Sequence, residues 1–171
     1  RVWDVVMGTP VSMASRGNDI RVDACCFIPP RLPNEESQWI WCALKTGELW
    51  EVEAETGVIT EQRSGAHTCS VTHMLRARAH IWTLDESGRL QCWYQRGETG
   101  RLSLKMQPAL RRVPAKVVAA IVVNYDQLWL STGKTVEVFL PLARSNSGDD
   151  IDEAGGGVLG SQTHIGYETA G

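Results

Sequence analysis

The chain has 171 residues and a formal charge of −3, with 43% apolar and 22% charged residues. The longest apolar run is Val117 to Val123, far shorter than the roughly 20 residues that cross a bilayer as a helix. No basic segment followed by an apolar one opens the sequence, so we expect neither a membrane-spanning helix nor a secretion signal. Because the sequence lacks an initial Met and stops in a Gly-rich tail, we expect it to be a piece of a longer protein.

In chain order, residues 1–4 predict the end of a β-strand, and Met7-Gly8-Thr9 predicts the turn after it. Further along the chain, three short apolar stretches each begin with Trp and end in a polar turn that contains Gly. An alternating run follows each Gly, which is typical of a β-hairpin. The three stretches are Trp41 to Gly47, Trp82 to Gly88 and Trp129 to Gly133, and the runs that follow are 48–53, 89–94 and 134–139.

The spacing of these segments predicts a β-propeller. When the apolar residues Trp3, Val52, Trp93 and Val138 are aligned, their separations are 49, 41 and 45 residues. Four antiparallel strands with their turns consume about 40 to 50 residues, which is the length of one propeller blade. A further apolar stretch precedes each Trp-led one, so each blade has four candidate strands. These stretches are Val22 to Ile28, Cys69 to Leu75 and Val117 to Val123.

Particular residues resemble the WD-repeat family. The dipeptide Trp3-Asp4 matches the strand end for which that family is named, and Ala66-His67 stands where the family has Gly-His. Thr83-x-Asp85 and Trp93 follow in the family's order. The resemblance implies that His67, Thr83, Asp85 and Trp93 form a buried hydrogen-bonded network within one blade. The turn between Asp85 and Trp93 is longer than the family's pattern, and the first and third repeats lack His or Trp.

A narrower resemblance covers about residues 1–142. The order Trp-Cys-x-x-Lys-Thr-Gly, Ala-His, Ile-Trp-Thr-Leu-Asp-Glu-Ser-Gly-Arg-Leu-Gln-x-Trp and Leu-Trp-Leu-Ser-Thr-Gly-Lys looks like the propeller region before the catalytic domain of fungal inositol-polyphosphate 5-phosphatases. That catalytic domain is Mg-dependent and removes a phosphate from phosphoinositides. None of its Asn, Asp and His motifs is visible here. The resemblance therefore implies a non-catalytic segment without catalytic residues, metal or cofactor, attached to such an enzyme.

The sequence also suggests a phosphate-binding loop, a zinc site and a catalytic triad, and each of them lacks a required feature. Residues 131–135, Ser-Thr-Gly-Lys-Thr, suggest a phosphate-binding loop, but the required earlier Gly is replaced by Leu128 and a strand follows. His67, Cys69 and His73 have like parity and could share a face, yet a structural zinc site needs a fourth ligand. Ser64 or Ser70 with His67 and Asp85 could be drawn as a catalytic triad, but no nucleophile elbow surrounds either Ser.

The five Cys are odd in number and irregularly spaced, unlike the disulfide framework of a small secreted domain. We therefore expect reduced thiols, with adjacent Cys25 and Cys26 packed in a core strand. This composition favours a cytoplasmic location, with the membrane periphery as the alternative.

Charge is unevenly distributed. Residues 35–61 hold seven acids and one base, whereas residues 76–116 hold nine bases and three acids. In the acidic region, alternation predicts that most of Glu48, Glu51, Glu53 and Glu55 face solvent. Such asymmetry bears on partners: the basic region either attracts an anionic membrane surface or balances the acidic region beside it, and nucleic acid is not expected. The repeats and the lack of a catalytic set predict an interaction scaffold with protein partners. The candidate basic interaction patch comprises Arg76, Arg78, Arg111, Arg112 and Lys116.

Together these observations predict an all-β chain, made of about three blades of a larger WD-type propeller. Residues 1–142 form the blades. Residues 143–157 are rich in Gly, Ser and acids, too polar to bury a core, so they predict a flexible loop or linker. Residues 158–171 are expected to start the next blade.

Overall fold

The structure is a computed structural model of the chain, and it describes residues 2–4, 6–7, 9–11, 20–28, 39–77, 80–94, 102–113, 116–117, 119–123, 127–139 and 163–166. Every regular element in this part of the chain is a β-strand, and the strands form antiparallel sheets. The all-β prediction is thus confirmed. Among the described residues, no helix is long and apolar enough to cross a membrane.

Three sheets have four strands each, and their order follows the sequence. The first blade contains β3 (Val22–Phe27), β4 (Trp39–Leu44), β5 (Leu49–Glu53) and β6 (Ile59–Arg63). The second contains β7 (Val71–Ala77), β8 (His80–Asp85), β9 (Arg89–Trp93) and β10 (Ala109–Arg112). The third contains β11 (Ala119–Val123), β12 (Gln127–Ser131), β13 (Thr135–Phe139) and β14 (Thr163–Gly166). A separate two-stranded sheet pairs β1 (Val2–Asp4) with β2 (Thr9–Val11).

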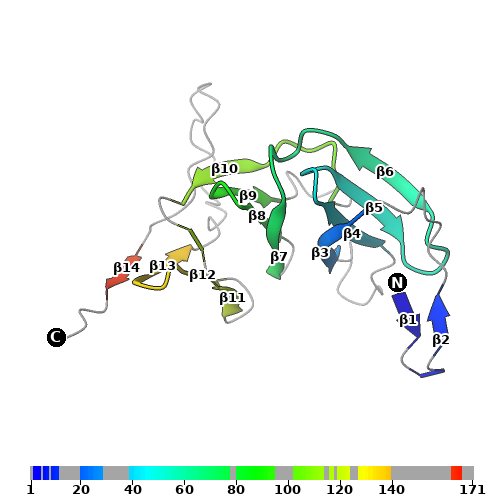
Figure 1. Ribbon diagram of the computed structural model, residues 1–171, viewed down its shortest axis with the longest axis horizontal. Coiled ribbons are helices and arrows are strands. Elements are labelled where there is room, and N and C mark those ends of the chain that lie inside the picture. Colours follow the sequence, from blue (N-terminus) through cyan, green and yellow to red (C-terminus); the bar gives the residue numbers. More distant parts are fainter. Residues whose placement is uncertain are drawn as a thin grey trace, which may run out of the picture.

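The three blades follow one another along an open arc, with β1 and β2 at one end and β14 at the other (Figure 1). The first strand of each blade lies beside that of its neighbour, because β7 contacts both β3 and β11. A sheet that meets its neighbours in this way places its outermost strand, β6, β10 or β14, away from the neighbouring blades. This is the arrangement of a partial propeller.

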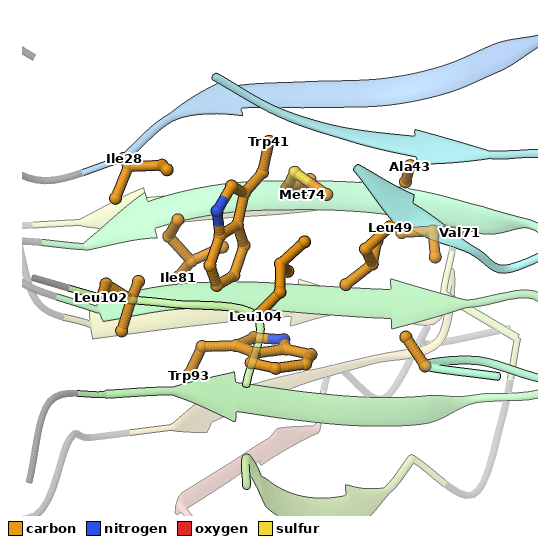
Figure 2. Packing of buried hydrophobic residues seen from close by; sticks show 11 residues of the cluster. Ile28, Trp41, Ala43, Leu49, Val71, Met74, Ile81, Trp93, Leu102 and Leu104 are labelled. Carbon is orange, nitrogen blue, oxygen red and sulfur yellow. The ribbon is translucent and has the colours of Figure 1, made fainter. Parts of the chain in front are cut away.

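Apolar side chains fill the space between consecutive blades. Between the first and second blades, the rings of Trp41 and Trp93 meet edge to face with their centroids 5.2 Å apart (Figure 2). Between the second and third blades, Trp82 packs against Phe139 with the ring centroids 6.3 Å apart. Successive side chains of a strand point to opposite faces of its sheet. The second blade therefore buries both faces, and β8 reads as an apolar run rather than an alternating one.

The strand register shows that the aligned residue in the third blade was one position wrong. The residue before each recurring Trp pairs with Val52 in the first blade, Trp93 in the second and Phe139 in the third. Phe139, not Val138, is therefore the equivalent residue. The third stretch reaches its Gly two residues sooner after its Trp than the other two do, and that shorter turn shifts the register.

In the first two blades, the recurring Gly of the turn contacts the segment that leads into the next blade. Gly47 has φ +83° and its carbonyl accepts a hydrogen bond from the His67 N–H at 3.0 Å. Gly88 has φ +82° and accepts the Val113 N–H at 2.8 Å. A Cβ on either Gly would lie 2.5 to 2.6 Å from a backbone oxygen, which no side chain tolerates. The equivalence also places Val113 where the second blade has His67, so the third blade lacks this histidine.

The connection from β9 to β10 is longer than the corresponding turn of the first blade, and its described residues 102–108 return to that blade. Leu102 and Leu104 are buried in the core between the two blades. The Arg63 guanidinium of β6 donates hydrogen bonds to the carbonyls of Leu104 and Met106 at 2.5 and 2.6 Å. We call residues 102–108 the return segment, and it fastens the outer strand of the first blade to the second.

Two further expectations concern the end of the chain. Residues 143–157, expected to be a linker, lie outside the described residues. Within 158–171 the structure describes only residues 163–166, which form β14, the fourth strand of the third sheet. The boundaries of the blade region and the linker stay predictions.

Candidate functional site

The four residues expected to form a blade network lie together in the second blade, and we call them the His67 network. His67 comes from the segment before β7, Thr83 and Asp85 from β8, and Trp93 from the end of β9. The His67 ring contacts the Asp85 carboxylate through Nδ1 and the Thr83 hydroxyl through Nε2, both at 2.8 Å. Trp93 Nε1 donates to the same hydroxyl at 2.9 Å. All four side chains are buried.

The hydrogen-bond partners of the His67 network favour one arrangement of its protons. An ionised carboxylate only accepts hydrogen bonds, so His67 Nδ1 carries a proton and donates it to Asp85. Thr83 Oγ1 already accepts from Trp93, and its hydroxyl then donates to His67 Nε2. This arrangement needs a neutral imidazole. Burial lowers the pKa of His67 and outweighs the Asp85 hydrogen bond and charge, which raise it.

Asp85 has a second role at the tip of the hairpin between β8 and β9. Its Oδ1 accepts the backbone N–H groups of Ser87 and Arg89 at 3.0 and 2.9 Å, and the Ser87 hydroxyl at 2.7 Å. Burial alone would raise the pKa of Asp85, but the hydrogen bonds from Ser87, His67 and Arg89 together hold it below its usual value. The carboxylate thus joins the turn to the network.

The His67 network offers no accessible nucleophile, because the Thr83 hydroxyl is 0% exposed and accepts from Trp93, so its geometry does not make a catalytic triad. The Ser70 hydroxyl donates to Asp23 at 2.6 Å rather than to His67. That hydrogen bond, with the Arg21 charge, lowers the pKa of Asp23 against the effect of burial. The His67 Nε2 position is occupied by Thr83, and the ring is only 1% exposed. The arrangement can hold a blade together, and it offers no access to a substrate.

The residues of the zinc-site and phosphate-loop alternatives have structural roles in the second and third blades. Both ring nitrogens of His67 are in hydrogen bonds, and His67 and Cys69 precede β7 instead of sharing its face with His73. In the described part of the chain, no three His, Cys, Asp or Glu residues are grouped as a metal would need. Residues 131–135 form the turn between β12 and β13, with Gly133 at φ +86°, so the hairpin interpretation is confirmed.

Glu51 was expected on the solvent side of its strand, and this expectation was wrong. The side chain is 0% exposed, and its carboxylate accepts Trp41 Nε1 at 3.2 Å and the Thr60 hydroxyl at 2.8 Å. We call these three residues the Glu51 group. Glu51 has the same parity as the buried Leu49 on β5, which was the signal that sequence reasoning missed.

The thiols fit the expectation of reduced cysteine, since all five are free. Burial raises the pKa of Cys26 and Cys92 to about 12 and that of Cys42 to about 11. These three thiols therefore stay protonated at neutral pH and pack as small apolar groups. Cys25, by contrast, is exposed on β3, although we expected it in the core, because its side of the first sheet has no blade packed against it among the described residues.

The structure places the candidate basic residues at two separate corners of the second blade. Arg76 lies on β7, near the turn to β8, where it pairs with Ile81. Arg111 and Arg112 lie on β10, near the opposite end of the sheet. Two strands separate β7 from β10, a spacing of about 14 Å. The structure does not bring Arg76 together with the β10 arginines, and Arg78 lies outside the described residues.

Lys116 lies at the same end of the sheet as the β10 arginines. It borders a pocket of about 480 Å³ between the second and third blades. The lining residues are Thr72, Asp85, Glu86, Gly88, Lys116 and Val117. The lining holds both signs of charge, so the pocket itself has no single electrostatic preference.

The blades, their stacking and the His67 network define part of a WD40-type β-propeller. Solved structures with this fold match the chain. The WD40 repeats of RRP9 align with a TM-score of 0.53 at 16% identity, over 73% of this chain and 37% of that one. The β-propeller domain of Cps50 (Swd1) from Myceliophteria thermophila aligns with a TM-score of 0.53 at 12% identity, over 82% and 44%.

The chain is also similar in sequence to a curated protein. The chain is 28% identical over 152 residues to a probable inositol polyphosphate 5-phosphatase of Schizosaccharomyces pombe. The match covers 88% of this chain but only 12% of that protein, so the chain spans about an eighth of its curated relative. A scan against known protein families finds no match. The resemblance to the propeller region of fungal 5-phosphatases is thereby confirmed.

Proposed function

We propose that this chain is a non-catalytic propeller segment that binds protein partners and is attached to an inositol polyphosphate 5-phosphatase in its parent polypeptide. The observation that carries the proposal is the match of 88% of the chain to a small fraction of such an enzyme. The buried His67 network supports it, because the polar groups that could do chemistry are enclosed and serve the blade. Propeller neighbours such as the WD40 repeats of RRP9 favour a role in protein interaction.

The test uses partner recovery from a cell extract. Alanine is introduced at the basic residues of the second blade, together and at each corner separately, and bound proteins are identified by mass spectrometry. The residues are Arg76, Arg78, Arg111 and Arg112. We expect specific partners to be lost from at least one corner variant, whereas Lys134→Ala on the exposed turn of the third blade retains them. Unchanged partners in every variant would contradict the scaffold role.

The enzymatic half of the proposal is tested on the parent polypeptide. We expect a 5-phosphatase catalytic domain on the C-terminal side of this chain, with activity toward phosphoinositides that survives deletion of the blades. Membrane docking through the basic blade is the competing function. Liposome sedimentation that rises with phosphoinositide content and falls with salt, and that is lost in the alanine variants, would favour docking over scaffolding.

A further inference from the structure

The outer strand of the second blade, β10, forms an open sheet edge. It stands at the end of its sheet, paired with β9 on one side only, and lies on the outside of the arc (Figure 1). An edge strand presents a row of unpaired N–H and C=O groups that another extended chain can pair with. Ala109 is buried, but the three residues after it are exposed.

The first blade shows how side chains of an outer strand can bind another segment. The side chains of Glu61 and Arg63 on β6 bond to the return segment, with Glu61 accepting the Ser103 hydroxyl at 3.0 Å and the Leu104 N–H at 3.2 Å. In the described part of the chain, no strand pairs with the outer side of β10, and no backbone hydrogen bond from outside its sheet reaches it. β10 therefore has one side on which a strand can add.

The charges on β10 select the kind of segment that fits. Arg112 is the direct cross-strand partner of Arg89 on β9, so both guanidinium groups stand on one face of the sheet. Like charges opposite each other destabilise a sheet, and neither arginine has an ion-pair partner among the described residues. A carboxylate placed between them would accept hydrogen bonds from both, in the geometry that arginine favours.

The same face supplies an apolar contact beside this pair. Leu110 precedes Arg112 by two residues, so both side chains lie on one face, and Leu110 is 53% exposed. A strand added to β10 would place one side chain opposite Leu110 and the next but one opposite Arg112. The matching segment therefore has an aliphatic residue followed two positions later by Glu or Asp, or the reverse order.

We propose that β10 binds an extended acidic segment of a partner protein, which adds to the second blade as a fifth strand. Leu110 packs against an aliphatic side chain of that segment, and Arg89 and Arg112 bind an acidic one two residues away. Main-chain hydrogen bonds supply affinity and the two side-chain contacts supply register, as in other strand-addition complexes. This inference rests on the proposed scaffold function and gives it a location and a ligand class.

The experiment titrates the chain with a fluorescent peptide of sequence Thr-Ile-Thr-Glu-Thr-Glu-Thr-Ser. We expect Arg112→Glu to weaken binding about tenfold or more, since one charge-assisted contact is replaced by repulsion. Lys134→Glu makes the same charge change on the exposed turn of the third blade and should leave binding unaltered. Because Arg112 is exposed, its variant should fold, and a thermal melt verifies this. Leu110→Ser provides a second, uncharged variant that should also weaken binding.

Two modified peptides test the main-chain hydrogen bonds. In an added strand only alternate N–H groups point to the neighbouring strand. N-methylation of one alternate set should therefore abolish binding, and methylation of the other set should preserve it. Equal binding of both peptides, equal binding of a Gln-for-Glu peptide, or equal binding to Arg112→Glu would overturn the proposal. Arg112-dependent binding to phosphatidylserine vesicles without peptide binding would also overturn it, in favour of a lipid surface.

Partner recovery separates this inference from the function on which it rests. If Arg112→Glu recovers the same partners as the unmodified chain and the peptide does not bind, the scaffold function stands and the β10 site is wrong. If the unmodified chain recovers no partner at all, the scaffold function fails whatever the peptide does.

Discussion

The first and second blades have the same strand order, yet they bury different polar groups. The second blade encloses the neutral His67 network, which links the preceding segment to two of its strands. The first blade encloses the Glu51 group, in which one carboxylate accepts from a Trp and a Thr on the two flanking strands. In both blades the buried polar group has hydrogen-bond partners, as buried polar groups require, and its chemical identity differs between them.

The difference also extends to how each blade connects to its neighbour. His67 links the segment between β6 and β7 to β8, whereas Glu51 accepts hydrogen bonds from Trp41 and Thr60, which belong to the strands on either side of β5. The first blade is joined to the second by the return segment, which packs in the core between the blades and accepts hydrogen bonds from Arg63 on β6. Variants at each attachment rank their contributions to stability.

The largest effect is expected for Trp93→Ala. Trp93 is 0% exposed, packs edge to face on Trp41 and donates to the His67 network, so its removal affects both blades. We expect the free energy of unfolding to fall by about 3–5 kcal/mol, the usual cost of deleting a buried aromatic ring. Urea denaturation followed by circular dichroism measures it. Trp129→Ala, at a half-buried ring of the third blade, should cost clearly less, and an equal loss would contradict this ranking.

The next prediction compares the two carboxylates directly. Asp85→Asn should reduce the free energy of unfolding by about 2–3 kcal/mol. The NH2 group of Asn is itself a donor, and it would face donors whose hydrogen bonds the Asp85 carboxylate accepts. Glu51→Gln should cost about 1 kcal/mol, because the amide oxygen of Gln can still accept from Trp41 or Thr60. Chemical denaturation of both variants gives the difference. Glu55→Gln, exposed in the turn after β5, is the control without effect, and the reverse order of costs would show that the Glu51 group is the main polar anchor.

These two carboxylates show what sequence could and could not predict. Asp85 was found because its spacing from His67, Thr83 and Trp93 matches a family pattern, and because Gly turns and the period of the Trp residues place each strand. Glu51 matches no pattern, and a strand of alternating Glu reads as a solvated edge. Its burial depends on the second blade covering that face, which is a tertiary contact that local alternation does not encode.

The separation of the basic residues illustrates the same limit. Arg76 and Arg112 belong to one basic region of sequence, and counting charges cannot tell that the meander carries them to opposite corners of the sheet. The return segment could not be foreseen either, because its contacts join residues about 40 positions apart. Strand order could be predicted from the repeat, whereas cross-blade contacts required the packed structure.

A smaller effect is expected from removing the attachment of the return segment. Arg63→Met loses two charge-assisted hydrogen bonds to main-chain carbonyls and the contact of the guanidinium over the Trp93 ring at 5.0 Å. We expect a loss of about 1–2 kcal/mol, because the group is only half-buried and water compensates part of the loss. Gln62→Met, exposed on the same strand, is the matched control. If both variants unfold at the same urea concentration, the return segment does not stabilise the pair of blades.

The smallest effect, and the one specific to the second blade, is a dependence of stability on pH. The pKa of His67 is lowered in the folded chain by burial, so below pH 6.5 the unfolded chain binds a proton that the folded chain does not. Stability then falls as pH decreases from 6.5 toward the lowered value, by less than about 1.4 kcal/mol per pH unit for one proton. His73 has a pKa shifted in the same direction by burial, so the contribution of His67 must be isolated by difference.

The free energy of unfolding is measured at pH 7.5 and at pH 5.5. Between these two values it should decrease less for His67→Gln than for the unmodified chain, while His73→Gln retains the His67 contribution. Equal slopes for His67→Gln and the unmodified chain would mean that folding does not shift the pKa of His67. A steeper fall for His67→Gln would mean that the imidazole is charged in the blade, and the donor at Nε2 would then be His67 rather than Thr83.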